Sequence, residues 1–193
     1  MRVILASKSP RRKEILETLG VKFEIRVADA DESSDVKDPE LLVQALAQKK
    51  GRAVLEGLED KNDCLLIACD TLVYAEGEFL GKPKDVADAT RMMRMLSGKA
   101  HIVVSGLYLY YDGREVGASA VTKVCFDQLS DSEIEDYVNT SEPYDKAGGY
   151  AVQGLAGKFV KGIEGDYFNV VGLPVNLLYR TLKEQFGLDI QRL

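Results

Sequence analysis

The residue best suited to chemistry in this chain is Asp70, an acidic side chain inside the apolar run LLIACDTLVYA. Burying an ionised carboxylate is costly unless a partner compensates its charge. A carboxylate at the inner end of a central strand commonly binds a metal ion or accepts a proton from water. The alternative is a buried aspartate that backbone groups or an arginine satisfy. We favour the functional interpretation.

A second group combines two hydroxyls with arginines: Ser7, Ser9, Arg11 and Arg12 lie where an expected strand turns into an expected helix. A helix N-terminus attracts anions, and the fork of an arginine matches the geometry of a phosphate. Cations are otherwise disfavoured in a first turn, so their presence there predicts that an anion binds. A solvated basic face with Ser9 capping the helix remains the alternative.

Three further residues are weaker candidates for a functional site. Glu32, in an acidic loop, is a candidate second magnesium ligand, because magnesium in phosphate sites takes one or two carboxylates and keeps several waters. Lys82 is a candidate phosphate cation on the turn Gly81-Lys82-Pro83, although the glycine spacing is not that of a P-loop. His101 is the only histidine, which rules out a histidine metal cluster and favours a structural role.

Composition limits the class of protein. The chain has 193 residues, 46% hydrophobic and 29% charged, which is ordinary for one globular domain. A net charge of −6 disfavours binding to nucleic acid or to an anionic membrane. The three cysteines form no C-x-x-C pair and are expected to be buried reduced thiols. No apolar run approaches a membrane span, so we expect a cytoplasmic protein.

The elements expected to position these residues are interleaved strands and helices. Asp112-Gly113 is a strong hairpin pattern that forces one antiparallel pair. The predicted fold class is therefore α/β: a single-domain mixed twisted sheet flanked by helices, with two lobes around a cleft. We expect strands at about residues 2–6, 22–27, 65–75, 101–111 and 115–126, and helices at about residues 10–19, 38–55, 86–96, 131–139 and 174–187.

Eight segments in order resemble the Maf family of nucleotide pyrophosphatases, and the match runs almost end to end. They are LASKSPRR, Asp31-Glu32-Ser33, LAQKKG, CDTLV, GKPKD, SGKAHIVVSG, EPYDKAGGYAVQG and GDYFNVVGLPV. Any one of them is weak, but the ordered set is a strong indication.

The resemblance implies a fold similar to that of inosine triphosphate pyrophosphatases, a divalent cation (Mg²⁺ or Mn²⁺) and a homodimer. It also implies cleavage of a nucleoside triphosphate between its α and β phosphates. Asp70 would be the general base and a metal ligand, with Glu32 assisting. The phosphate site would contain Ser7, Ser9, Arg11, Arg12, Lys50 and Lys82. Substrate choice would involve Arg12, Thr71 and Gln153.

The segment KAGGYAVQG resembles the branch that acts on dTTP and UTP, with modified pyrimidine nucleotides as further candidates. The Gln153 amide offers both a donor and an acceptor, which suits the O4 and N3–H edge of uracil or thymine. Two alternatives remain: a purine-cleaning inosine triphosphate pyrophosphatase, and a nucleotide-binding regulator of cell division. One departure is Lys50-Gly51, where the family usually has Lys-Ala, and we expect no effect on the chemistry.

Overall fold

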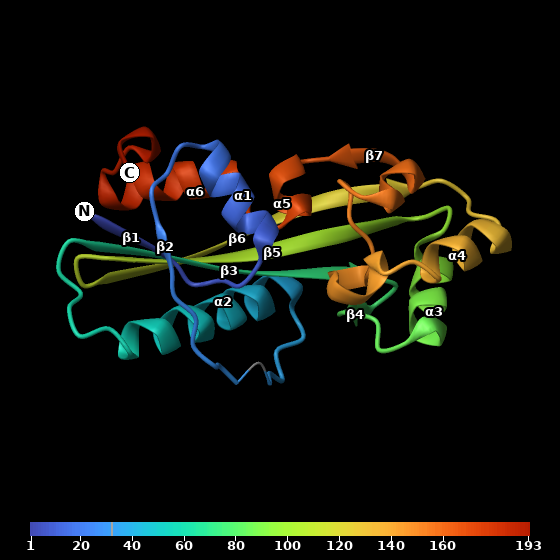
Figure 1. Cartoon of the computed structure of the whole chain (residues 1–193), viewed down its shortest axis with the longest axis horizontal. Coiled ribbons are helices and arrows are strands. Elements are labelled where there is room, and N and C mark those ends of the chain that lie inside the picture. Colours follow the sequence, from blue (N-terminus) through green and yellow to red (C-terminus); the bar gives the residue numbers. More distant parts are fainter. Residues whose placement is uncertain (32) are drawn as a thin grey trace. The chain divides into compact units, whose positions relative to one another are not determined.

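Strands of both directions form one sheet in the computed structural model, which describes residues 1–31 and 33–193 (Figure 1). Over these residues the sheet has seven strands in the order β2-β1-β3-β5-β6-β7, and β4 pairs with β3 off this path. β1 is parallel to β2 and β3, whereas β4 and β7 run antiparallel to β3 and β6. The predicted mixed α/β class is confirmed. The strands are β1 (Arg2–Leu5), β2 (Glu24–Ile25), β3 (Cys64–Ala75), β4 (Glu78–Leu80), β5 (Ala100–Tyr111), β6 (Arg114–Phe126) and β7 (Val160–Glu164).

The hairpin between β5 and β6 turns at the predicted dipeptide. Asp112 has φ 50° and Gly113 has φ 77°. Two successive positive φ values are the conformation of a type I′ turn, whose twist matches that of the strands on either side. The dipeptide pattern therefore predicted both the position and the direction of this connection.

The described chain separates into two compact units. Unit 1 comprises Met1–Asp70, Ser105–Ala120 and Gly172–Leu193, and unit 2 comprises Thr71–Val104 and Val121–Val171. The single domain and the cleft expected from the sequence stay predictions.

Unit 1 places helices on both faces of its strands (Figure 1). α2 (Pro39–Glu56) covers one face through a core that includes Ile4, Leu66 and Tyr108. α1 (Pro10–Thr18) and α6 (Val175–Thr181) lie on the other face. A π-helical turn, Leu182–Phe186, continues α6 to Gly187, whose left-handed φ of 66° ends it.

The two proline-led helices of unit 1 begin differently. Asp38 caps α2 by accepting a hydrogen bond from the amide of Leu41 at 2.9 Å. Ser9 occupies the N-cap of α1 but makes no side-chain cap bond. Instead, its amide donates to the Ser7 hydroxyl at 3.2 Å. The alternative in which the Ser9 side chain caps the helix is therefore wrong.

Unit 2 has its own apolar core, in which α3 (Val86–Leu96) packs against α4 (Asp131–Val138). α4 begins with a capping box between Ser130 and Glu133. Unit 2 also contains β7 and short helical segments that were not predicted from the sequence. They are α5 (Tyr167–Val171) and the 3-10 segments η1 (Glu142–Asp145), η2 (Ala147–Gly149) and η3 (Leu155–Phe159), and a fourth 3-10 turn, Ile190–Arg192, closes the chain in unit 1.

None of the helices in the described part of the chain is both long and apolar enough to cross a membrane. The cytoplasmic location stays a prediction.

Candidate active site

Asp70 lies on β3, beyond the point where the parallel neighbour β1 ends. β1 pairs with β3 in parallel up to Leu5 opposite Ile67, and Asp70 follows on the same strand. Ligands of parallel sheets bind at this carboxyl end of the strands. Asp70 is 8% exposed, and Lys50 on α2 forms an ion pair with its Oδ1. Within the described chain, the partner of Asp70 is therefore a lysine, and not the backbone groups or the arginine considered from the sequence.

Arg12 and Ser7 meet at the end of β1. Arg12 donates through Nη1 to the Ser7 hydroxyl at 3.0 Å and through Nε to the carbonyl of Gly172 at 2.8 Å. Ser7 is 7% exposed, while Arg11 and Ser9 are half-buried on the same turn. The two bonds orient the guanidinium, which a lysine could not reproduce because it lacks a planar fork.

Gly172 is a site residue that the sequence reasoning missed. Its carbonyl accepts from Arg12 and also from the thiol of Cys69 at 3.4 Å, so it joins α1 to β3 beside Asp70. Gly172 has φ 125°, a conformation that strongly favours glycine. Its place in GDYFNVVGLPV was the available indication, but the contact partner lies 160 residues away. All three cysteines are free, and the expected burial is confirmed for Cys64 and Cys69 but wrong for Cys125, which is half-buried.

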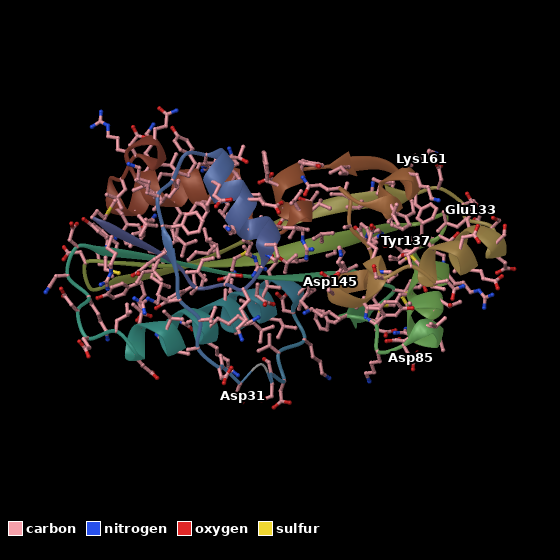
Figure 2. All side chains as sticks on the ribbon, in the orientation of Figure 1. Asp31, Asp85, Glu133, Tyr137, Asp145 and Lys161 are labelled. Atoms are coloured by element: carbon pink, nitrogen blue, oxygen red, sulfur yellow. The ribbon has the colours of Figure 1, made fainter. Side chains whose placement is uncertain are left out.

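The acidic loop approaches α2 next to Lys50. Lys49 donates to the carbonyl of Ser33 at 2.6 Å, and Ser33 in turn hydrogen-bonds Asp31 through its hydroxyl and its amide. These bonds, the hydroxyl's first, lower the pKa of Asp31, which is labelled in Figure 2. Glu32, the predicted second carboxylate, lies outside the described residues.

The other predicted residues, Thr71, Lys82 and Gln153, belong to unit 2. Thr71 follows Asp70 directly on β3 and is half-buried, whereas Lys82 and Gln153 are exposed. The turn that carries Lys82 is held by a hydrogen bond from the Gly148 amide to the Gly81 carbonyl at 3.0 Å. Their assembly with the residues of unit 1 into one substrate site stays a prediction.

His101 is a core residue of unit 2. It is 4% exposed, and its Nε2 lies 2.7 Å from the Tyr150 hydroxyl. Burial lowers its pKa to about 4, so the ring is neutral at physiological pH. Phe126 packs edge-on against it. These surroundings support the structural role expected of this histidine.

Comparison with known proteins identifies the family. A family model described as Maf-like protein matches residues 2–185. The chain belongs to this family.

Three relatives of this Maf-like chain match it over 97–100% of its length. A protein of Thermosipho africanus named dTTP/UTP pyrophosphatase is 42% identical over 192 residues, covering 100% of this chain and 97% of the relative. A protein of the same name from Caldanaerobacter subterraneus subsp. tengcongensis is 44% identical, covering 97% and 90%. Another, from Bacillus thuringiensis subsp. konkukian, is 43% identical, covering 98% and 97%.

One solved structure, described as a HAM1 protein from Coxiella burnetii, is similar over 67% of this Maf-like chain and 74% of that chain. The TM-score is 0.45 and the sequence identity is 13%. This likeness is too distant to support an argument about the site.

The donor set of the Maf-like chain is compatible with a divalent cation that binds together with a phosphate ligand. Asp70 supplies hard carboxylate oxygens, but the described residues contain no cluster of three or more His, Cys, Asp or Glu side chains that could hold a metal alone. Magnesium characteristically uses one or two protein carboxylates and takes its other ligands from phosphates and water. The carboxylate of Asp70 therefore fits a cation that is shared with the phosphates of a substrate.

Proposed function

We propose that this Maf-like protein hydrolyses dTTP and UTP to the nucleoside monophosphate and pyrophosphate. The observation that carries the proposal is the ion pair between the buried Asp70 on β3 and the half-buried Lys50 on α2. Asp70 lies next to the end of the parallel strand that leads to Ser7 and Arg12. The three relatives, all named dTTP/UTP pyrophosphatase at 42%, 44% and 43% identity, support the same reaction.

In the proposed reaction, Asp70 accepts a proton from the water that attacks the α-phosphorus. The bond from the α-phosphorus to the oxygen bridging to the β-phosphorus breaks, and pyrophosphate leaves with the electron pair. Lys50, Arg12 and Ser7 contact the phosphate oxygens and stabilise the developing negative charge, which is the main demand of phosphoryl transfer. A divalent cation bound by Asp70 and Glu32 would neutralise further phosphate charge.

Two other groups complete the proposed site. Lys82 is exposed on its turn, and we assign it to the phosphates. Gln153 is exposed as well, and we assign its amide to the O4 and N3–H edge of the pyrimidine. Arg12, which already has two hydrogen-bond partners, and Thr71 would contribute to substrate choice.

The test is cation-dependent release of pyrophosphate from dTTP, UTP, CTP, ITP and GTP by the wild type and Asp70→Asn. A general base contributes about 10²–10⁴-fold, so the variant should lose at least a hundredfold in kcat. Glu164→Gln is the matched control, because Glu164 is an exposed carboxylate that also pairs with a lysine, at 2.9 Å. The control should retain wild-type activity.

Other results would point to the alternatives. Release mainly from ITP would assign the chain to purine cleaning, and nucleotide binding without turnover would favour a regulatory role. More than a tenth of wild-type turnover in Asp70→Asn would refute the role proposed for Asp70.

The proposal includes a homodimer and dependence on Mg²⁺ or Mn²⁺. Light scattering after size-exclusion chromatography measures the mass in solution against the 21.3 kDa of one chain. Chelation followed by titration with each cation measures the dependence. A monomeric mass, or full activity in excess chelator, would contradict the corresponding part.

A further inference from the structure

Glu142, the first residue of η1, uses both of its carboxylate oxygens on neighbouring groups. Oε2 accepts a hydrogen bond from the amide of Leu155 at 2.7 Å. Oε1 accepts one from the amide of Ala156 and one from the Tyr137 hydroxyl, each at 3.1 Å. Three donors from two other segments of unit 2 therefore converge on one acidic side chain.

Two of these donors are the first amides of η3, directly after Gln153 and Gly154. The first amides of a helical turn have no partner within it, so a carboxylate that accepts both fixes where the turn begins. Gly154 shows how closely the backbone approaches: a Cβ built there would lie 2.4 Å from the Glu142 carboxylate. The backbone next to Gln153 thus rests directly on Glu142.

Tyr137 connects the same carboxylate to the turn of Lys82. Its hydroxyl also lies 3.1 Å from the carbonyl of Gly149, in the segment whose Gly148 amide holds the Gly81 carbonyl. Tyr137 is buried in the core of unit 2 and is labelled in Figure 2. Burial, with Glu142 second, raises its pKa, so the phenol stays protonated and remains a donor.

We propose that Glu142 is a positioning residue that sets the location of Gln153 and thereby the selectivity for the pyrimidine base. This inference rests on the proposed function, because it assumes that Gln153 reads the base. Glu142 itself acts only through the backbone that follows Gln153. A base-reading amide must be held within a fraction of an ångström, and an exposed loop needs such a support.

The variant Glu142→Gln tests the positioning role, because glutamine has nearly the same size and shape as glutamate. An amide side chain has one oxygen and one NH₂ group, so it cannot accept from Leu155 and Ala156 together without facing a donor with a donor. We expect the ratio of kcat/KM for dTTP to that for CTP to fall about tenfold, through a higher KM for dTTP. Hydrogen exchange of a peptide covering residues 151–157 should become about tenfold faster.

The matched control is Glu133→Gln, in the first turn of α4. Glu133 likewise accepts a backbone amide, that of Ser130 at 2.8 Å, but this bond closes the capping box of α4 and does not hold the amides of Leu155 and Ala156. Its selectivity ratio should stay within about twofold of the wild type. A double variant, Glu142→Gln with Gln153→Ala, should be no less selective than Gln153→Ala alone, because the two residues act in one chain of contacts.

The outcomes separate the two hypotheses. Equal losses on dTTP and CTP, an unchanged selectivity ratio, or additive losses in the double variant would each overturn the role of Glu142 while leaving the proposed function intact. A wild-type protein that does not hydrolyse dTTP or UTP would instead overturn the proposed function, and this inference with it. Melting curves of both single variants establish that folded proteins are compared.

Discussion

The departure from Lys-Ala at Lys50-Gly51 makes a sharp prediction about stability. Gly51 lies inside α2, where alanine would normally stabilise a helix by about 1 kcal/mol. A Cβ at this position would, however, lie 2.2 Å from Cδ1 and 2.4 Å from Cε1 of Tyr108. Tyr108 is 1% exposed and belongs to the core beneath α2. We therefore predict that Gly51→Ala destabilises the protein.

The size of the effect follows from these two opposing terms. Carbon atoms pack at about 3.5–4.0 Å, so the ring would have to move by more than about 1 Å in a close-packed core. Overpacking of this kind costs about 1–3 kcal/mol, and the two ring contacts place Gly51→Ala in the upper part of that range. After subtracting the helix term, the expected net loss is about 1–2 kcal/mol. For a chain of this size the melting temperature should fall by about 2–8 °C.

Urea unfolding followed by circular dichroism measures the free energy of unfolding of each variant. Gly57→Ala is the matched control, because Gly57 ends the same helix with a negative φ and its Cβ would meet the Val54 carbonyl at an ordinary 3.6 Å. The decisive comparison uses a Tyr108→Leu background, which removes the ring. There Gly51→Ala should stabilise by about 0.5–1 kcal/mol, because only the helix propensity remains.

A change of sign between the two backgrounds is the result that the packing argument requires. Stabilisation by Gly51→Ala in the wild-type background would refute it, since the ring would then not occupy the place of the missing Cβ. An equal loss in both backgrounds would also refute it, because the cost would then arise from something other than Tyr108.

Two further predictions concern acid stability and substrate binding. His101 stays neutral in the folded protein down to about pH 4, whereas an unfolded histidine binds its proton near pH 6.5. The stability that the neutral His101 gives the folded protein is therefore fully present above pH 6.5. As the pH falls toward 4, the free energy of unfolding decreases by up to about 3 kcal/mol. The free energy of unfolding of His101→Gln, measured by urea titration at pH 7 and pH 4, should not show this loss. An equal fall in the free energy of unfolding of both proteins between the two pH values would contradict the argument. Arg12→Lys should lower kcat/KM for dTTP about 10–100-fold, because lysine cannot hold both Ser7 and Gly172 while facing a phosphate. A kcat/KM of Arg12→Lys within twofold of the wild-type value would show that the planar guanidinium is not required.

Much of the local structure could be read from the sequence. The boundaries predicted for α3, Val86–Leu96, agree with the structure, and Asp112-Gly113 marked the hairpin turn. These features depend on neighbours a few residues apart: apolar periodicity, a capping aspartate, or a turn dipeptide that tolerates positive φ. β7 was missed because its five residues, VKGIE, are short, contain a glycine and depend on pairing with β6.

Residue types and order were also sufficient to select the main candidates of the site. Asp70 was chosen because a carboxylate in an apolar run needs a partner, and the ordered motifs indicated the Maf family, which comparison confirmed. The type of a side chain is a local property, so its chemical capacity can be judged without a fold.

Only the tertiary structure decided which groups meet. Lys50 reaches Asp70 because α2 packs across the face of β3, and Arg12 finds the carbonyl of Gly172 across 160 residues of sequence. The packing of the Tyr108 ring against Gly51 likewise could not be predicted from the sequence. Such contacts depend on strand order, on the packing of side chains and on backbone carbonyls, which every residue has and no pattern of residue types distinguishes.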